Sequence, residues 1–451
     1  MSFDWQTDAH EWDERETRRS GRRAADLPPL NEALFGGPEP EPLPTAPLRG
    51  RRRRWLSLAA IGALVVALAA VLVWQLQRNA TEAEARLTTE VAASHNAILE
   101  AAANSDNELF VSFLSGSDRD WAEAQQYLAR HGSFLDRAAF GLSLTPSATV
   151  SPTVSLAPDL RSAELTRPQT YAVAVGNGLT ETVTLEQTAV YRLGPDRWLF
   201  APPDDAFWGE TATVGGRYVQ VTYPARDAAV AEPLARDVDA ALAEFCRNLD
   251  EACASLHLVL STNPASLIAY DRPAGAWTGG SEIVMPTPTL FGRPTDDAGQ
   301  RALTRVYAAR AVSAAAANFS GWRCCDDALF YGALLDAQLN QLGLRPWPVG
   351  AAEYARLTRE PEVLRAIEGL WQREEATAEE RWLAYTLVDF IVARSNVPIP
   401  TMQRILLSDI EMPYWAWITR ATDGLYGSQA DFERDLLRYA AERGLDSAAL
   451  H

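Results

Sequence analysis

Residues 55–74 read WLSLAAIGALVVALAAVLVW and contain no charged side chain. A helix rises about 1.5 Å per residue, so a stretch of this length spans about 30 Å, the thickness of the hydrocarbon core of a bilayer. Tryptophans at both ends are typical of membrane–water interfaces. A secretory signal peptide begins nearer the N-terminus and has a shorter apolar core. The sequence therefore predicts a transmembrane helix over residues 55–77 and a single-pass membrane protein.

Arginines on either side of this stretch predict its orientation. A cluster precedes it, whereas Arg78 alone follows it closely, and the cluster consists of Arg49, Arg51, Arg52, Arg53 and Arg54. Positively charged flanks stay on the cytoplasmic side of a membrane. We therefore expect a signal-anchor helix in the plasma membrane that contacts the lipid bilayer through residues 55–77. The N-terminus would be cytoplasmic and the C-terminal region would lie outside.

The segment before the apolar stretch, residues 1–54, is rich in Pro, Glu and Arg and lacks hydrophobic periodicity. Such a composition buries too little apolar surface to fold, which predicts a disordered tail. The apolar residues of LNEALF at 30–35 leave a short docking motif open as an alternative to a plain linker. The chain contains no lysine and many alanines, which favours a GC-rich bacterial source.

The net charge of -18 arises beyond the predicted membrane segment, because residues 1–78 carry nearly equal numbers of acids and arginines. An acidic body repels phosphate backbones, so we expect no nucleic acid partner. Walker A, G-x-G-x-x-G and G-x-S-x-G motifs are also absent from the sequence.

Residues 78–209 change from a helical to a strand-like pattern. Leu87, Val91 and Ile98 recur at helical spacing, whereas TVTLEQTAVYR at 182–192 alternates like a strand. Helices followed by an antiparallel sheet resemble the NTF2-like α+β fold, which hosts enzymes in some proteins and acts as a spacer in others. We interpret the two histidines of this region, His95 and His131, as packed or surface residues.

Residues 210–451 are predicted to begin with strands at 217–222, 255–260 and 282–285, with a helix between the first two. A long helix is expected over about 297–318, and the chain is helical from there on. This order resembles the gluzincin, peptidase-MA-like metallopeptidases. The predicted fold class is thus α+β, with an NTF2-like domain followed by a zincin-like domain whose C-terminal half is mostly helical.

The resemblance to gluzincins implies a zinc site on the long helix, built from HExxH. The best register places Ala309 and Ser313 at the histidine positions and Arg310 at the glutamate position. None of these side chains can bind zinc or activate water there. The five histidines of the chain also lack ligand spacing, and they are His10, His95, His131, His257 and His451. The resemblance therefore implies a degenerate peptidase, and we expect no metal, cofactor or catalytic residue.

The cysteines fall into two pairs. Cys246 and Cys253 lie between a predicted helix and a predicted strand, and cysteines outside the cytoplasm tend to be oxidised. We predict a disulfide between them, worth about 2–3 kcal/mol by loop entropy. Cys324 and Cys325 are adjacent, which leaves a vicinal disulfide and, with less support from the spacing, a metal site open.

Two further groups of residues have a structural and a functional interpretation. Asp326 and Asp327 precede a predicted helix, where capping is favoured over acid–base chemistry. A group of tryptophans is interpreted as core rather than as a binding surface, and it consists of Trp322, Trp347, Trp371, Trp382, Trp415 and Trp417.

The sequence thus favours a membrane-anchored, non-catalytic extracytoplasmic protein that binds an envelope protein or a ligand. Two alternatives stay open. One is a divergent extracytoplasmic hydrolase or peptidase, and the other is a single-pass signalling protein with a sensory ectodomain.

Overall fold

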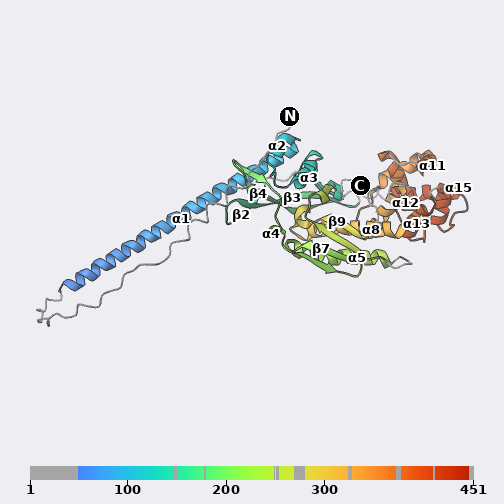
Figure 1. Cartoon of the computed structure of the whole chain (residues 1–451). Coiled ribbons are helices and arrows are strands. Elements are labelled where there is room, and N and C mark those ends of the chain that lie inside the picture. Colours follow the sequence, from blue (N-terminus) through green and yellow to red (C-terminus); the bar gives the residue numbers. More distant parts are fainter. Residues whose placement is uncertain are drawn as a thin grey trace, which may run out of the picture. The chain divides into compact units, whose positions relative to one another are not determined.

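The computed structural model describes residues 49–145, 150–176, 179–247, 249, 253–268, 280–322, 328–371, 377–409 and 412–445. The chain divides into two units, residues 1–75 and 76–451. The second unit has an α+β fold, with two sheets and a series of C-terminal helices (Figure 1).

The first described element, α1 (Arg49–Ala103), is one continuous helix. Among the described residues, no helix is both long enough and apolar enough to cross a membrane. Along α1 the side chains are described mainly from Leu64 on, and charged residues follow from Arg78. The prediction of a single-pass membrane protein with a signal-anchor helix over 55–77 is accordingly wrong for the described chain.

Other predictions for the N-terminal region fall on residues outside the described part. These are the tail at 1–48 and the side chains of the arginine cluster, Arg49 and Arg51 to Arg54.

The first sheet is built around a long antiparallel hairpin, β3 (Ser162–Gly176) and β4 (Leu179–Leu193). Its order is β1–β3–β4–β10, and β2 and β5 pair with β3 and β4 respectively. The short strands are β1 (Leu142–Leu144), β2 (Thr153–Leu156), β5 (Trp198–Phe200) and β10 (Arg293–Pro294). The helices before it are α2 (Asn107–Ser112) and α3 (Arg119–Arg130), with a 3-10 turn, η1 (Ala138–Phe140), after them.

The apolar residues predicted at helical spacing near the start of this region lie on the buried side of the C-terminal part of α1. Val91 and Ile98 are fully buried and belong to one cluster with Leu165, Tyr191 and Trp198 of the first sheet. Because successive strand residues point to opposite faces, the alternating pattern of β4 lets one face of the sheet pack here.

The second sheet has the order β6–β7–β8–β9, in which only β6 is antiparallel to its neighbour. Its strands are β6 (Thr211–Gly215), β7 (Val219–Pro224), β8 (Leu256–Ser261) and β9 (Glu282–Pro286). Parallel neighbours need a crossover, and α5 (Ala228–Arg247) supplies it between β7 and β8. The residues of β7–β9 that share the core with α5 and α8 (Asp297–Ser320) are Val219, Val221, Tyr223, Leu256, Leu258, Leu260, Ile283 and Met285.

Short elements connect these parts of the second unit. They are α4 (Asp205–Trp208), η2 (Ala225–Asp227), α6 (Ala265–Ile268) and α7 (Pro288–Phe291).

The chain after α8 is helical in its described part, as the sequence predicted. The elements are α9 (Ala328–Gln341), α10 (Ala351–Arg359), η4 (Pro361–Arg365), α11 (Ala366–Trp371), α12 (Ala378–Arg394), α13 (Ile399–Ser408), α14 (Tyr414–Ala421) and α15 (Gln429–Leu445). Tyrosine–carboxylate hydrogen bonds join several of them. Tyr354 of α10 and Tyr439 of α15 both donate to Asp389 of α12, at 2.5 and 2.7 Å.

The two domains expected on either side of residue 209 are closely connected in the second unit. Strand β10, from the later region, pairs with β4 of the earlier one. Arg226 forms an ion pair with Glu164, and the Thr295 hydroxyl donates to the Thr184 carbonyl at 3.1 Å. One hydrophobic cluster also contains residues from both regions.

Candidate functional site

The helix position at which the gluzincin resemblance would place zinc is filled by packing. Ala309 is buried, and the Ser313 hydroxyl donates to the Ala309 carbonyl within α8 at 2.7 Å. Arg310 is half-buried on the same helix. Among the described residues, no three His, Cys, Asp or Glu side chains converge as a metal site would require.

Two of the described histidines, His95 and His131, lie in different environments. His95 is buried on α1, and its Nδ1 lies 2.8 Å from the Tyr191 hydroxyl. Burial, and secondly the positive charge of Arg167, lower the pKa of His95 to about 4. His131 is exposed, stacks on Tyr127 and has its Nδ1 2.9 Å from the Tyr127 carbonyl. His10 and His451 lie outside the described residues.

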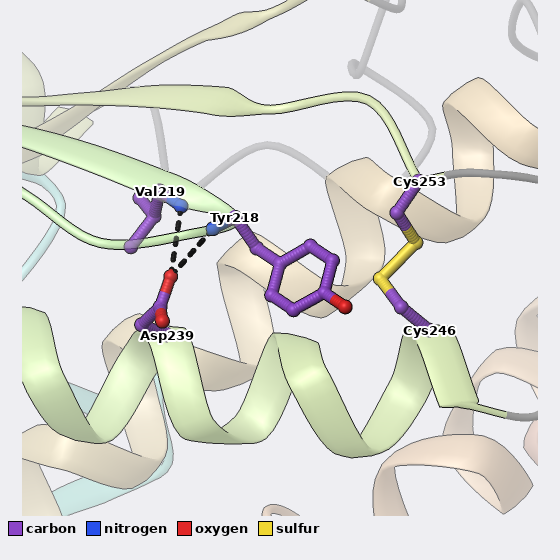
Figure 2. Close-up of a disulfide and its surroundings, with 5 residues drawn as sticks. All are labelled: Tyr218, Val219, Asp239, Cys246 and Cys253. Atoms are coloured by element: carbon purple, nitrogen blue, oxygen red, sulfur yellow. Dashed lines mark hydrogen bonds between the residues drawn. A yellow bond between two sulfur atoms is a disulfide. The ribbon is translucent and has the colours of Figure 1, made fainter.

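The structure joins Cys246 and Cys253 in a disulfide with a Cα–Cα distance of 5.8 Å, between the end of α5 and the segment before β8. In Figure 2 the ring of Tyr218 lies between Asp239 and the disulfide. Asp239 of α5 accepts the backbone N–H groups of Tyr218 and Val219 at 2.6 and 3.1 Å (Figure 2). The bridge therefore holds the α5–β8 connection where α5 also anchors the start of β7. Cys324, Cys325, Asp326 and Asp327 lie outside the described residues.

A cavity of about 170 Å³ opens beside the turn that follows α3. It is lined by Leu128, His131, Ser133, Asp136, Arg137, Ala138, Ala139, Phe140 and Leu267. The lining thus combines one carboxylate, one guanidinium and one imidazole with apolar side chains from α3, η1 and α6.

Arg137 is the most buried charged group of this cavity, with 3% of its surface exposed. Its Nε and Nη2 donate to the carbonyls of Phe291 and Leu290 at 3.2 and 3.3 Å. Its Nη1 donates to three carbonyls of the preceding turn, those of Ser133, Phe134 and Asp136. Burial lowers the pKa of Arg137. A guanidinium has five N–H groups, so one N–H of Nη2 has no acceptor among the described residues.

The carboxylate beside Arg137 is also partly used by the backbone. Asp136 Oδ1 accepts the N–H groups of Arg137 and Leu144 at 2.9 and 2.8 Å. Its Oδ2 accepts no hydrogen bond from another described residue. Arg137 and Asp136, which both line the cavity, therefore each keep hydrogen-bonding capacity that no other described residue uses.

A hydrogen-bond network fixes the turn that carries these two groups. Tyr171 donates to the Leu135 carbonyl at 2.9 Å, and Gln187 Nε2 donates to the Tyr171 hydroxyl and to the Phe291 carbonyl at 2.9 and 3.1 Å. Gly292 has φ +128°, and a Cβ there would lie 2.6 Å from Gln187 Nε2. Glycine is required because a side chain at this position would displace Gln187.

A second polar group lies on the exposed face of the second sheet, and sequence reasoning missed it. The Thr222 hydroxyl oxygen is 2.8 Å from His257 Nε2, and His257 Nδ1 is 3.6 Å from a Glu282 carboxylate oxygen. Thr213 Oγ1 lies 3.2 Å from Thr222 Oγ1. These residues come from four successive strands, β6 to β9. Their sequence signal was the polar phase of three alternating strands, which becomes a site only once strand order and register are known.

The tryptophans follow the core interpretation. Trp322, Trp371 and Trp417 are buried, and Trp347, Trp382 and Trp415 are partly buried against the same cluster.

No family model, curated protein or solved structure matches this chain. The NTF2-like and gluzincin resemblances therefore stay predictions.

Proposed function

We propose that this protein binds a small polar ligand, outside the cytoplasm, in the cavity beside Arg137. The observation that carries the proposal is the pair of charged groups in one small cavity, the buried guanidinium of Arg137 and the free Oδ2 of Asp136. Buried polar groups normally have partners, so a donor and an acceptor at a cavity wall indicate an occupant that supplies both.

The size and chemistry of the cavity limit the occupant. A dry cavity of about 150 Å³ holds a molecule the size of benzene, whereas drug-sized ligands need about 300 Å³ or more. The remaining Arg137 N–H suits a carbonyl or carboxylate oxygen, and Asp136 Oδ2 suits an N–H group. His131 Nδ1 faces a carbonyl and so carries the proton, which leaves Nε2 as a further acceptor. A molecule with a carbonyl oxygen and N–H donors, such as an amide or a urea, satisfies these groups together.

Two other features support this function and its compartment. The Cys246–Cys253 disulfide is typical of proteins in oxidising compartments. The side chains at the zincin register of α8 offer no zinc ligand, because Ala309 has only a methyl group and the Ser313 hydroxyl is bonded within the helix. The second feature argues against metallopeptidase chemistry at that helix.

Titration of the full-length chain with urea, acetamide and acetate at low millimolar concentrations, observed by NMR, tests the proposal. Binding should be lost in Ala139→Phe, which adds a bulky ring to the cavity lining, and weakened in Asp136→Asn. Asp159→Asn is a matched control, because Asp159 Oδ1 also accepts a backbone N–H but lies away from the cavity. Saturation by none of the three probes, or equal saturation of the wild-type and Ala139→Phe chains, would rule the site out.

A further inference from the structure

The exposed face of the second sheet carries two rows of side chains that cross its parallel strands. Strand register pairs Gln220 with His257 and His257 with Glu282. The next row on the same face pairs Thr222 with Val259 and Val259 with Val284. One row is polar and the other combines a hydroxyl with two apolar side chains.

The Thr222 hydroxyl links the two rows. It lies diagonally across the β7–β8 pair from His257, and its oxygen is 2.8 Å from Nε2. Glu282 lies on the other side of the same imidazole, 3.6 Å from Nδ1. A carboxylate on that side favours the tautomer with the proton on Nδ1, so Nε2 is the acceptor that faces the hydroxyl. Hydroxyl, imidazole and carboxylate thus occur in the order that activates a nucleophile.

We propose that Thr222, His257 and Glu282 form an acyl-transfer site that cleaves esters of short aliphatic acids. Thr222 Oγ1 attacks the ester carbonyl carbon, and its proton moves to His257 Nε2. The bond to the leaving oxygen breaks, and that oxygen takes the proton from Nε2. Water then attacks the acyl group on Thr222, with His257 accepting the water proton and returning it to Thr222 Oγ1.

The neighbouring side chains define the rest of the site. Gln220 is exposed, lies two residues before Thr222 on the same face and forms no hydrogen bond with another described residue. Its amide N–H groups suit the developing oxyanion, a role that glutamine side chains can fill. Val284 is 47% exposed, and with Val259 it forms an apolar strip beside the nucleophile. This strip suits the alkyl part of an acyl group.

Glu282 is a positioning residue, because it acts through His257. The distance of 3.6 Å exceeds a hydrogen bond, and such contacts in ligand-free sites often shorten when the substrate binds. The site is open to solvent on a sheet face. An ester presented on a larger molecule can therefore reach Thr222 as readily as a small one.

Hydrolysis of p-nitrophenyl butyrate and p-nitrophenyl acetate by the full-length chain tests the proposal. We expect an initial burst, faster turnover of butyrate than of acetate, and an acyl adduct on Thr222 in the mass spectrum of the acid-quenched protein. Thr222→Val and His257→Ala should lower the rate about 100-fold, the usual share of general-base catalysis. Thr222→Ser should retain activity, and Val284→Asn should remove the preference for butyrate.

Controls separate this site from ordinary surface reactivity. Thr211→Val changes an exposed threonine of β6 that has no imidazole partner, and it should leave the rate unchanged. Glu282→Gln should lower the rate while the melting temperature is unchanged, and Glu282→Asp should restore part of it. A wild-type rate in Thr222→Val, or an acyl adduct found only on other residues, would overturn the proposal. The cavity beside Arg137 uses none of these residues, so ligand binding there and ester cleavage here fail independently.

Discussion

Arg137 and Asp227 are two buried charged side chains that the protein satisfies in opposite ways. Arg137 donates only to backbone carbonyls, whereas Asp227 accepts from two threonine hydroxyls, those of Thr287 and Thr289. Asp227 is fully buried, and neither residue forms an ion pair with another described residue. Each charge is therefore held by neutral dipoles.

Helix α7 connects the two charges. Thr287 is its N-cap residue and Thr289 lies in its first turn, whereas Leu290 and Phe291 supply carbonyls at its C-terminal end. The carboxylate thus sits at the positive end of the helix dipole and the guanidinium at the negative end. Because Arg137 belongs to the early region of the second unit and Asp227 to the later one, this short helix joins both regions beside the cavity.

The difference between the two charges predicts unequal costs of removal. Arg137→Met takes the donors away from five backbone carbonyls, of which that of Phe291 is buried and the others are partly buried. A hydrogen bond to a charged group contributes about 1.5–3 kcal/mol, so the loss of several should lower the free energy of unfolding by about 3 kcal/mol or more. Urea unfolding followed by circular dichroism measures it. Arg137→Lys keeps the charge with fewer donors, so its free energy of unfolding should fall less than that of Arg137→Met. Equal stability of Arg137→Met and the wild type would show that the carbonyls find water instead.

His95 is a third buried titratable group. Unlike Arg137, it can lose its charge in the folded protein. Its pKa is about 4 in the folded protein, below its ordinary value of 6.5. Between these two values the unfolded chain binds the proton and the folded chain does not. Stability therefore falls as pH falls from 6.5 to 4, by about 3 kcal/mol for a shift of this size.

Unfolding by urea at pH 7 and at pH 4 tests this contribution. His95→Gln keeps a hydrogen-bonding group beside Tyr191 and removes the titration, so its stability should change less with pH than that of the wild type. His131→Gln is the control, because His131 is exposed. The same pH dependence in His95→Gln and in the wild type would contradict the assignment to His95.

The sequence predicted the local part of this fold but not its long-range part. The strands near 217–222 and 282–285, the long helix near 297–318 and the Cys246–Cys253 bridge follow from periodicity and spacing. The pairing of β10 with β4 does not, because a two-residue strand has no periodicity to detect. The transmembrane prediction relied on length and hydropathy alone, and the finding for the described residues contradicts it.

The site residues show the same limit. Arg137 and Asp136 lie in a turn, and the partners that define them, Leu290, Phe291 and Leu144, are distant in sequence. His257 is one of the histidines that lack ligand spacing in the sequence, and its partners lie on β7 and β9. Only strand register brings Thr222 and Glu282 to it.

Asp227→Asn should cost less than Arg137→Met, about 1–3 kcal/mol. The amide oxygen can still accept a hydrogen bond from one threonine hydroxyl. The NH₂ group would face the other hydroxyl, which would then have to accept a hydrogen bond instead of donating one. Urea unfolding of the single variants and of the pair Asp227→Asn with Thr289→Val measures this. The pair should lose less than the sum of the two single losses, because the residues share one hydrogen bond. Additive losses would show that the bond contributes nothing.

Gln187→Ala should have the smallest effect, because both of its partners keep another contact. The Phe291 carbonyl still accepts from Arg137, and the Tyr171 hydroxyl still donates to the Leu135 carbonyl. The expected loss is that of an ordinary hydrogen bond, about 1 kcal/mol. The substitution also removes the atom nearest to a Cβ at position 292, although Leu185 Cβ would still lie 2.9 Å away and φ stays positive. Gly292→Ala should therefore cost less in the Gln187→Ala background than in the wild type, while remaining destabilising in both. An equal cost in the two backgrounds would mean that backbone strain and the contact with Leu185, and not the contact with Gln187, make glycine necessary beside Arg137.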